Sequence, residues 1–473
     1  MSSQPSAKKI IIVGAGLVGS LLAVRLRQLG FQVAAFEKRP DIRKSTIDGG
    51  RSINLVITSR GINALQEAGL LAQAVQKSVP VYGRMMHSRT GELAYQPYGQ
   101  NQECNLSISR ALLNQFLLDE AEKQKTDLHF NSSVTDIDFK NKTITTNQGQ
   151  QFSYDFIFAT DGSGSLIRKK FVDSDSQIKF STDWLPVDYK ELLLPLPKDA
   201  AATEQFLKKY QKDALHIWPR ITHMMMALAN RDGSFTVTLY LPKESQRTEF
   251  SFAQISTDQK IENLFNSEFA DAKKDMPDYL NEFNENPQGN LGTVKLSKWT
   301  DGKSILFLGD AAHAIVPFFG QGTNLGFEDI STFIKLLQHN LFEWEKTFSD
   351  FEKTQKPNAD AIAEMAIENW FEMSERVADP KFLLRKKVEA ELEKRFPDLF
   401  KSRYGLVTYT LTPYAAIQKA GWQQDEIFAD LLSELKTPDD FHKVNWLKAE
   451  DLLRTKYQSF KTEFHISHQR VTI

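Results

Sequence analysis

The hydrophobic pattern near the N-terminus combines short apolar runs with a helical spacing. Ile10–Val13 is an apolar run of the kind that a buried parallel strand gives, and Phe31–Phe36 is a second one. Between them, apolar residues recur at helical spacing over Leu17–Leu29. The sequence therefore predicts a strand, a helix and a second strand within about 28 residues, which is one βαβ unit.

The pattern changes character farther along the chain. Helical patterns and short apolar runs of buried-strand type follow at Gly61–Ala74, Ser109–Lys125, Tyr154–Thr160 and Ile305–Leu308. Residues 171–297 differ, because Thr222–Leu241 alternates like two strands joined by a turn at Asn230–Gly233. We therefore expect an antiparallel sheet in this middle region, as a second domain.

The chain from Phe327 onwards is mostly helical in pattern. Pro357–Arg376 is the clearest predicted helix, with proline at its first position and acidic residues in its early turns. One face of this helix, at steps of four, three and four, holds Ile362, Ala366, Asn369 and Met373. Asn369 is thus a polar amide on an apolar stripe, so it must either be paired within the protein or face a ligand.

Composition narrows the class of protein. The chain has 473 residues, of which 41% are hydrophobic and 25% charged, as in soluble globular proteins. A net charge of −2 argues against a nucleic-acid binder, and the single cysteine, Cys104, excludes disulfide scaffolds and cysteine-based metal centres. Apolar runs fall far short of the roughly 20 residues that cross a bilayer. The first nine residues hold no signal-peptide core, so we expect a soluble cytoplasmic protein.

The first motif that carries chemistry is the turn Gly14-Ala15-Gly16-Leu17-Val18-Gly19, a G-x-G-x-x-G between a predicted strand and a predicted helix. Gly14 permits a tight turn, Gly16 lets the backbone approach a diphosphate, and Gly19 lets the helix pack close to the sheet. The free N–H groups and the dipole at the helix N-terminus favour an anion there. The motif therefore predicts a dinucleotide site.

Glu37 ends the second predicted strand, 18 residues after Gly19, where it can accept hydrogen bonds from ribose hydroxyls. An acid at this place would repel a 2′-phosphate, so the bound nucleotide is FAD or NAD rather than NADP. Arg39 follows two residues later, where its side chain could stack on the adenine ring.

Three more segments extend this site. Leu308–Ala314 follows a predicted strand about 290 residues downstream, and Gly320–Asn324 comes soon after. NAD dehydrogenases have no need of such an element, whereas the ribityl chain and ring of a flavin need contacts beyond the adenosine pocket. Asp310 can bind a ribityl hydroxyl, and backbone N–H groups of Gly320–Gly326 can reach the pyrimidine edge of the ring. The other segment is Asp161–Arg168.

In this order, the G-x-G-x-x-G turn, the Asp161-Gly162 segment and the Gly309-Asp310 segment resemble the group A flavoprotein aromatic hydroxylases, which have the para-hydroxybenzoate hydroxylase fold. The resemblance implies an α/β (α+β) chain: a Rossmann-like FAD-binding domain with an inserted antiparallel-sheet substrate domain and a C-terminal helical region. We expect His313 to be a structural histidine rather than a catalytic base, and we expect no metal site.

Three segments are more distinctive, namely Arg51–Leu55, Leu215–Arg220 and Gly309–Asp329 with its insert Ile315–Gly320. Together they resemble the kynurenine 3-monooxygenase family, in a match spread over roughly residues 8–415. The resemblance implies hydroxylation of L-kynurenine to 3-hydroxy-L-kynurenine through a C4a-hydroperoxyflavin. FAD would be tightly but non-covalently bound, and NADPH, a transient co-substrate, and O2 would be consumed.

The region Gly83–Tyr98 reads as two strands with a turn at Thr90-Gly91, a register in which Arg84 and Tyr98 could face one cavity. The planar fork of Arg84 suits a carboxylate, although on the residues alone a solvated surface arginine is the simpler interpretation. The resemblance implies four substrate-binding residues: Arg84, Tyr98, Asn369 and Tyr404.

The motifs and the resemblance together predict the cofactor-binding residues Gly14, Gly16, Leu17, Val18, Gly19, Glu37, Lys38, Arg39, Asn54, Arg110, Val134, Asp310, Gly322, Thr323 and Asn324. The catalytic segment where oxygen transfer occurs is predicted to comprise Pro317, Phe318, Phe319 and Gly320. Phe318 and Phe319 would suit a protein core equally well. No strong protein base is expected, because the aniline amino group activates the substrate ring itself.

We expect three domains, with the FAD-binding domain drawn from residues 1–75, 100–170 and 298–340, the substrate domain from 76–99 and 171–297, and a helical domain at 341–473. The expected partners are the small molecules L-kynurenine, NADPH and O2, with no nucleic acid and no transmembrane segment, in a monomer or homodimer. Two alternatives are a related flavin hydroxylase acting on another aromatic acid and a non-catalytic FAD-binding protein.

Overall fold

The computed structural model describes residues 8–44, 54–99, 103–372, 379–463 and 466. Of the segments singled out above, Arg51–Ile53 and Met373–Arg376 lie outside the described residues. The chain divides into two compact units. Unit 1 comprises Met1–Ser78, Ile108–Trp184 and Gly292–Asp360, and unit 2 comprises Val79–Ser107, Leu185–Leu291 and Ala361–Ile473.

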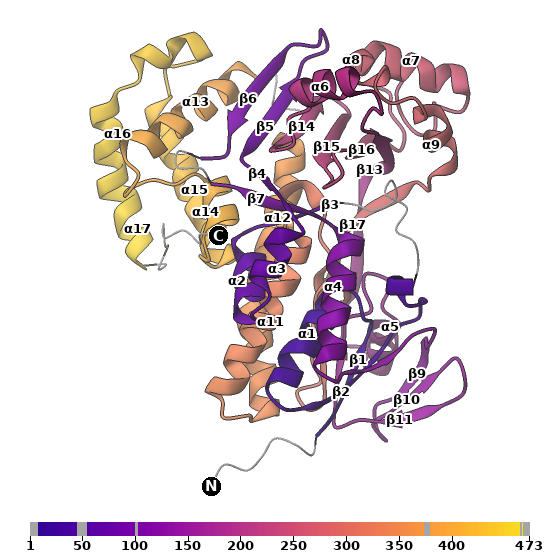
Figure 1. The fold of residues 1–473 in the computed structure, drawn as a ribbon. Coiled ribbons are helices and arrows are strands. Elements are labelled where there is room, and N and C mark those ends of the chain that lie inside the picture. Colours follow the sequence, from indigo (N-terminus) through magenta and orange to yellow (C-terminus); the bar gives the residue numbers. More distant parts are fainter. Residues whose placement is uncertain (1–7, 45–53, 100–102, 373–378, 464–465, 467–473) are drawn as a thin grey trace. The chain divides into compact units, whose positions relative to one another are not determined.

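Unit 1 is built on a five-stranded parallel sheet with the order β18-β12-β1-β2-β8. Two of its strands, β1 and β2, are labelled in Figure 1. The strands are β1 (Lys9–Val13), β2 (Gln32–Phe36), β8 (Asp127–His129), β12 (Phe156–Ala159) and β18 (Ile305–Phe307). The helix α1 (Leu17–Gln28) links β1 to its parallel neighbour β2, so the predicted βαβ unit is confirmed. The central strands are buried almost throughout, as a sheet covered on both faces requires.

Unit 1 also contains a small antiparallel sheet of β9 (Val134–Asp138), β10 (Thr143–Thr146) and β11 (Gln151–Ser153). Its helices include α2 (Ser59–Glu67), α3 (Leu71–Gln76), α4 (Arg110–Lys123), α5 (Leu166–Ser174) and α11 (Gly322–His339). α1 packs against α4 and α11, and α2 packs against α11. The predicted helical stretch over 61–74 forms two helices, because α2 ends at a turn in which Gly69 has φ +74°. The N–H of Gly69 donates to the carbonyl oxygen of Gln66 in this turn.

The helix predicted to begin at Pro357 begins earlier, so that boundary is wrong. α12 runs from Trp344 to Phe371 with Pro357 inside it. Proline removes one backbone hydrogen bond, but the apolar stripe continues across it, because Phe348, Phe351 and Ile362 are all buried. Packing of this stripe therefore overrides the local stop signal.

Unit 2 contains most of a seven-stranded sheet with the order β17-β13-β16-β15-β14-β5-β6. Its strands are β5 (Gly83–His87), β6 (Leu93–Pro97), β13 (Phe180–Leu194), β14 (Ala214–Pro219), β15 (Met224–Ala229), β16 (Phe235–Pro242) and β17 (Gly289–Leu296). The two predicted hairpins are confirmed, β5–β6 and β15–β16, with Gly91 and Gly233 at positive φ in their turns. The sheet is not wholly antiparallel, because β14 and β5 pair in parallel. A separate antiparallel pair joins β4 (Val79–Val81) to β7 (Asn105–Ser109).

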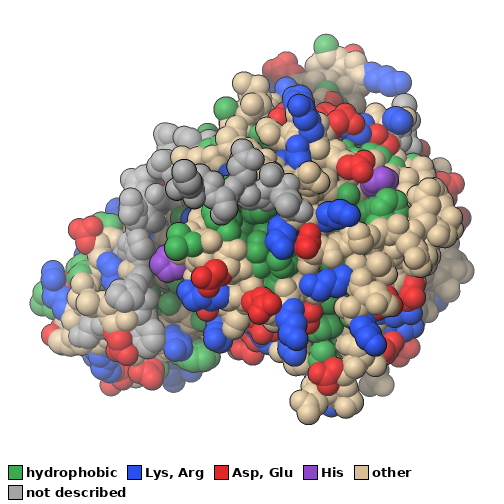
Figure 2. Space-filling model, turned by 90° about the horizontal axis from the view of Figure 1, so that it is seen from below, with side chains coloured by type: hydrophobic (Ala, Val, Ile, Leu, Met, Phe, Trp, Pro, Cys, Tyr) green, Lys and Arg blue, Asp and Glu red, His purple; other side chains and the backbone are tan. Residues whose placement is uncertain are grey.

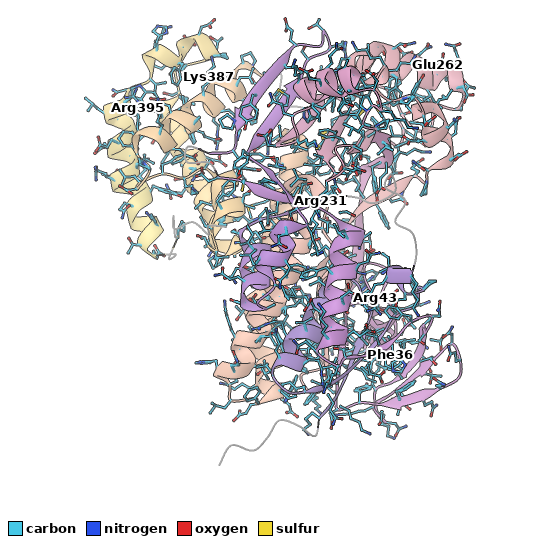
Figure 3. All side chains as sticks on the ribbon, viewed as in Figure 1. Phe36, Arg43, Arg231, Glu262, Lys387 and Arg395 are labelled. Atoms are coloured by element: carbon cyan, nitrogen blue, oxygen red, sulfur yellow. The ribbon has the colours of Figure 1, made fainter. Side chains whose placement is uncertain are left out.

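Apart from the C-terminal part of α12, the helices of unit 2 fall into two groups. Those between the strands are α6 (Ala200–Lys209), α7 (Asp258–Glu268), α8 (Ala270–Lys273) and α9 (Tyr279–Glu285). The later ones are α13 (Pro380–Arg395), α14 (Arg403–Tyr409), α15 (Tyr414–Leu431), α16 (Trp446–Leu452) and α17 (Gln458–Glu463). The guanidinium carbon of Arg395, a residue labelled in Figure 3, lies 4.5 Å from the ring centre of Trp446, and this contact links α13 to α16. The expectation that residues 341–473 form a separate domain stays a prediction.

The distinctive segment Leu215–Arg220 lies in the core of unit 2. His216 is fully buried, and its Nδ1 lies 2.8 Å from Nε2 of His87, whose Nδ1 lies 2.9 Å from a carboxylate oxygen of Asp271. Trp218 donates its indole N–H to the same carboxylate. Burial lowers the pKa of His216 to about 3, so this histidine is neutral at physiological pH. The segment thus stabilises the sheet and its helices.

Charged side chains on the surface are mixed in sign. On the face shown in Figure 2, basic and acidic groups are interspersed. This agrees with the composition, since the chain has 58 lysines and arginines and 60 aspartates and glutamates. In unit 1, for example, Arg43 (labelled in Figure 3) bridges Asp41 at 2.8 Å and Glu122 at 2.9 Å. No helix in the described part of the chain is long and apolar enough to cross a membrane.

Candidate active site

The glycine-rich turn after β1 has the tight geometry that its sequence predicts. Gly14 has φ +96°, and a Cβ there would lie 2.5 Å from the carbonyl oxygen of Thr160. A Cβ on Gly19 would collide with the carbonyl oxygen of Gly14. Both positions therefore exclude any side chain, which allows α1 to begin immediately after the turn that follows β1.

Gly16 differs from its two neighbours, because a Cβ at this position would meet nothing within 4 Å. It is the N-cap of α1, and its backbone is extended, with φ −74° and ψ −167°. The first-turn N–H groups, including those of Leu17 and Val18, precede the first intrahelical bond, which Ser20 donates to Gly16. Open space in front of free N–H groups at a helix N-terminus fits a diphosphate.

Glu37 lies buried just past the end of β2. Its Oε2 accepts the N–H of Ala15 at 3.1 Å, and its Oε1 accepts the backbone N–H and Nε–H of Arg39 at 3.0 and 2.8 Å. Burial raises the pKa of Glu37, but the bonds from Arg39 outweigh it and the net shift is downward, so the group is a carboxylate. It keeps lone pairs for ribose hydroxyls. Arg39 and Lys38 are exposed, and their contact with adenine stays a prediction.

The Gly309-Asp310 segment packs directly against the first glycine-rich motif. Gly309 has φ +58°, and a Cβ there would lie 2.9 Å from Cγ2 of Val18. A Cβ on Gly326 would lie 2.6 Å from the same methyl group. Val18 thus fits between two glycines, which brings together segments about 290 residues apart in one site.

The segment Asp161–Arg168 is hydrogen-bonded to the Gly309-Asp310 segment. Oδ2 of Asp161 accepts the N–H of Leu166 at the start of α5. Nη1 of the buried Arg168 donates to the carbonyl oxygen of Ala311 at 2.8 Å, in the helix α10 (Asp310–His313). Arg168 therefore fixes the segment that carries Asp310, the predicted ribityl contact.

His313 pairs with Asp329 of α11 behind this turn, as expected for a structural histidine. Nε2 of His313 lies 2.7 Å from Oδ2 of Asp329, and the same oxygen accepts the N–H of Gly309 at 2.8 Å. Both side chains are buried. The pair therefore anchors the start of α10, and Asp329 is a positioning residue that the sequence motif did not single out.

The His313–Asp329 pair predicts a pH dependence of stability. Burial lowers the pKa of His313, but Asp329 raises it more, so the net pKa lies above the ordinary value of 6.5. The stabilisation is therefore fully present below about pH 6.5 and is lost as the pH rises through the raised pKa. We expect His313→Gln to lower Tm by roughly 2–5 °C at pH 6, and by less at pH 9, in differential scanning calorimetry. A difference that stays constant across this range would contradict the ion pair.

The predicted catalytic segment forms a short 3-10 helix, η2 (Pro317–Phe319), that ends at Gly320 with φ +64°. Phe318 is buried, and Phe319 is half-buried. The 18-residue helix α11 follows, and Gly322, Thr323 and Asn324 are its first three residues. Their N–H groups at the positive end of a helix suit the pyrimidine edge of a flavin.

Asn324 uses its side chain within the protein. Its Oδ1 accepts the N–H of Thr58, and its Nδ2 donates to the carbonyl oxygens of Val56 and Gly320 at 2.8 and 2.7 Å. It holds the junction between β3 (Asn54–Ile57) and α2 against the start of α11. A contact from Asn324 to a cofactor would therefore come from its backbone.

The remaining predicted cofactor residues lie on separate elements of unit 1. Asn54 begins β3, Arg110 is the exposed first residue of α4, and Val134 is the buried first residue of β9. Their contacts with FAD stay predictions. Thr160 was not foreseen: its hydroxyl donates to the carbonyl oxygen of Gly14 at 2.8 Å and supports the turn.

The predicted carboxylate-binding residues form a cluster in unit 2. The guanidinium carbon of Arg84 lies 4.7 Å from the ring centre of Tyr404 and 5.6 Å from that of Tyr98. The two rings are stacked, with centres 5.7 Å apart. Arg84 comes from β5, Tyr98 follows β6 and Tyr404 lies on α14, so three elements converge on one cation.

The charge of this cluster suits an anion. Burial lowers the pKa of Arg84, but the hydroxyls of Tyr404 and Tyr98 outweigh it, and the guanidinium stays charged. Burial also raises the pKa of Tyr98, which remains a neutral donor. The buried Nε of Arg84 has no acceptor among the described residues. A carboxylate would provide one and neutralise the charge.

Asn369 belongs to the same unit as this cluster, on α12. Ile362 and Ala366 on its predicted face are fully buried and Asn369 is half-buried, which confirms the helical spacing for these residues. Met373, the fourth position of that face, lies outside the described residues. Contact of Asn369 with substrate stays a prediction.

Comparison with known proteins identifies the family. A family model described as "FAD binding domain" matches residues 7–363. The kynurenine 3-monooxygenase of Myxococcus xanthus is 42% identical over 468 residues, covering 98% of each chain. This chain belongs to the kynurenine 3-monooxygenase family. The family's enzymes from Christiangramia forsetii and Legionella pneumophila (strain Corby) are 38% and 37% identical, covering 90% and 94% of this chain and 94% and 97% of theirs.

Solved structures agree on the fold of this kynurenine 3-monooxygenase family member. Tetrameric 2-methyl-3-hydroxypyridine-5-carboxylic acid oxygenase matches with a TM-score of 0.61 at 19% identity, covering 79% of this chain and 94% of its own. PqsL of Pseudomonas aeruginosa, in complex with 2-aminobenzoylacetate, matches with a TM-score of 0.62 at 17% identity, covering 78% and 97%. The predicted fold class, with an FAD-binding domain, is confirmed.

Proposed function

We propose that this chain is an FAD-dependent monooxygenase that hydroxylates L-kynurenine to 3-hydroxy-L-kynurenine with NADPH and O2. The observation that carries the substrate assignment is the Arg84–Tyr98–Tyr404 cluster, in which a guanidinium with a buried Nε lies beside two stacked tyrosine rings. It occurs in a chain whose other unit holds the glycine cradle for a dinucleotide. An aromatic substrate with a carboxylate head fits both features.

The cluster would hold the α-carboxylate of the substrate. The planar guanidinium of Arg84 pairs with both carboxylate oxygens, and the hydroxyls of Tyr98 and Tyr404 donate to the same group. Asn369 would add a contact from α12. These contacts fix the orientation of the ring relative to the amino-acid head, which is the protein's main contribution to rate and regiospecificity.

FAD, when bound, would supply the redox chemistry that activates O2 for hydroxylation of the substrate ring. In unit 1 the diphosphate would lie on the N-terminus of α1, Glu37 would bind the ribose, and Asp310 the ribityl chain. The segment Pro317–Gly320 would line the place where oxygen transfer occurs and would exclude water from it. The substrate's own amino group activates the ring carbon ortho to it, so no protein base is assigned.

NADPH oxidation by the purified holoenzyme tests this assignment. We further propose that substrate binding promotes the reduction of FAD by NADPH, so L-kynurenine should accelerate NADPH oxidation by at least about tenfold. 4-Hydroxybenzoate, an aromatic acid without an amino-acid head, should have no such effect. Acceleration by 4-hydroxybenzoate alone would favour a sister hydroxylase, and no acceleration by either compound would favour a non-catalytic FAD-binding protein.

A further inference from the structure

Tyr409 lies at the end of α14, five residues after Tyr404. Its side chain is buried, with 5% exposure, and its hydroxyl has no hydrogen-bond partner among the described residues. The ring stands edge-on to that of Tyr404, with centres 6.3 Å apart. A buried hydroxyl without a partner is destabilising, so such a group is usually satisfied by a ligand or a water.

The electrostatic surroundings of this hydroxyl include the Arg84–Tyr98–Tyr404 cluster. Burial raises the pKa of Tyr409, with further effects from Tyr404, Tyr98, Arg84 and Glu103. The hydroxyl is therefore neutral, and its lone pairs are available to a donor. Its charged neighbours have both signs, Arg84 positive and Glu103 negative.

Glu103 brings its carboxylate to the loop that carries Tyr98. A Cβ added at Gly99 would collide with Oε2 of Glu103, so the carboxylate lies against the backbone next to Tyr98. Arg84, Tyr98 and Tyr404 all present donors, and these suit a carboxylate. An ammonium group carries only donors and needs acceptors and negative charge, which the Tyr409 hydroxyl and the Glu103 carboxylate can give.

We infer that Tyr409 is a further substrate-binding residue, whose hydroxyl accepts a hydrogen bond from the α-ammonium group of an amino-acid substrate. The head of the substrate is then recognised as a zwitterion, the carboxylate by Arg84 and the ammonium beside Tyr409. This inference rests on the proposed function. It explains the unpartnered hydroxyl and selects amino acids over simple aromatic keto acids.

The test compares Tyr409→Phe with the wild type on two substrates, L-kynurenine and 4-(2-aminophenyl)-4-oxobutanoate, which lacks only the α-amino group. We expect KM for L-kynurenine to rise roughly tenfold, with kcat changed less than twofold. KM for the desamino analogue should be the same in both proteins. The matched control is Tyr154→Phe, which removes another buried hydroxyl without a partner among the described residues, in unit 1. It should leave both KM values unchanged.

An unchanged KM for L-kynurenine in Tyr409→Phe would overturn the inference, and so would an equal rise for both substrates. Because the hydroxyl makes no bond within the described protein, its removal should not lower Tm. A large loss of stability would show that the group serves the fold and would also overturn the inference. Failure of the wild type to turn over L-kynurenine would instead refute the proposed function, so the two failures are distinguishable.

Discussion

Replacing Arg84 with alanine is expected to raise KM for L-kynurenine by about 100-fold while FAD remains bound. Removing one partner of a buried, hydrogen-bonded charge pair costs about 2–5 kcal/mol. The guanidinium lies beside the stacked rings of Tyr98 and Tyr404, and its buried Nε lacks an acceptor among the described residues, so we expect the substrate carboxylate to be its partner. Arg84 is not among the residues predicted to bind FAD, so flavin content should not change.

Steady-state kinetics and the flavin absorbance of the purified variant measure the two effects separately. Arg89→Ala is the matched control. Arg89 lies near the turn of the same hairpin, where its 64% exposed side chain pairs with Glu268 at 2.7 Å. The Arg89→Ala variant should have a KM for L-kynurenine within about twofold of that of the wild type. A wild-type affinity for L-kynurenine in Arg84→Ala would refute the carboxylate assignment.

Replacing Gly16 with valine is expected to weaken FAD binding at least about 100-fold without unfolding the protein. Valine can adopt the extended backbone of this N-cap, and its Cβ meets no protein atom within 4 Å. The branched side chain would instead occupy the space in front of the α1 N-terminus, where the diphosphate is proposed to lie. The Tm of the apoprotein should change by less than about 3 °C, since surface changes of this kind are mild.

Isothermal titration of the apoprotein with FAD and a thermal melt without FAD measure these two effects. Gly19→Ala provides the contrast, because its Cβ would collide with the carbonyl oxygen of Gly14 and should lower both stability and affinity. FAD binding by Gly16→Val with wild-type affinity would mean that the open space at Gly16 is not the diphosphate site.

Much of unit 1 could be predicted from the sequence, because local signals and long-range packing agree there. The apolar run Ile10–Val13, the glycines after it and Glu37 all follow from the needs of one βαβ unit, and the structure places them together. The hairpin that carries Arg84 was predictable for the same reason, since Thr90-Gly91 supplies a turn between alternating strands.

Other features depend on contacts that no local pattern records. The continuation of α12 through Pro357 follows from the buried stripe on either side of the proline. Asp329 anchors Gly309 across 20 positions, and nothing near either residue signals the bond. Tyr409 resembles an ordinary core tyrosine in the sequence, and only its unpartnered hydroxyl beside Tyr404 distinguishes it. Residues brought together by tertiary packing are thus the ones that sequence reasoning missed.

The central claim is that this chain places one oxygen atom on the ring of L-kynurenine. The most direct measurement is mass spectrometry of the product after a reaction of the purified holoenzyme with NADPH, L-kynurenine and ¹⁸O₂. We predict 3-hydroxy-L-kynurenine that carries one ¹⁸O atom, formed in step with NADPH oxidation. Consumption of NADPH with release of hydrogen peroxide and unchanged L-kynurenine would contradict the account.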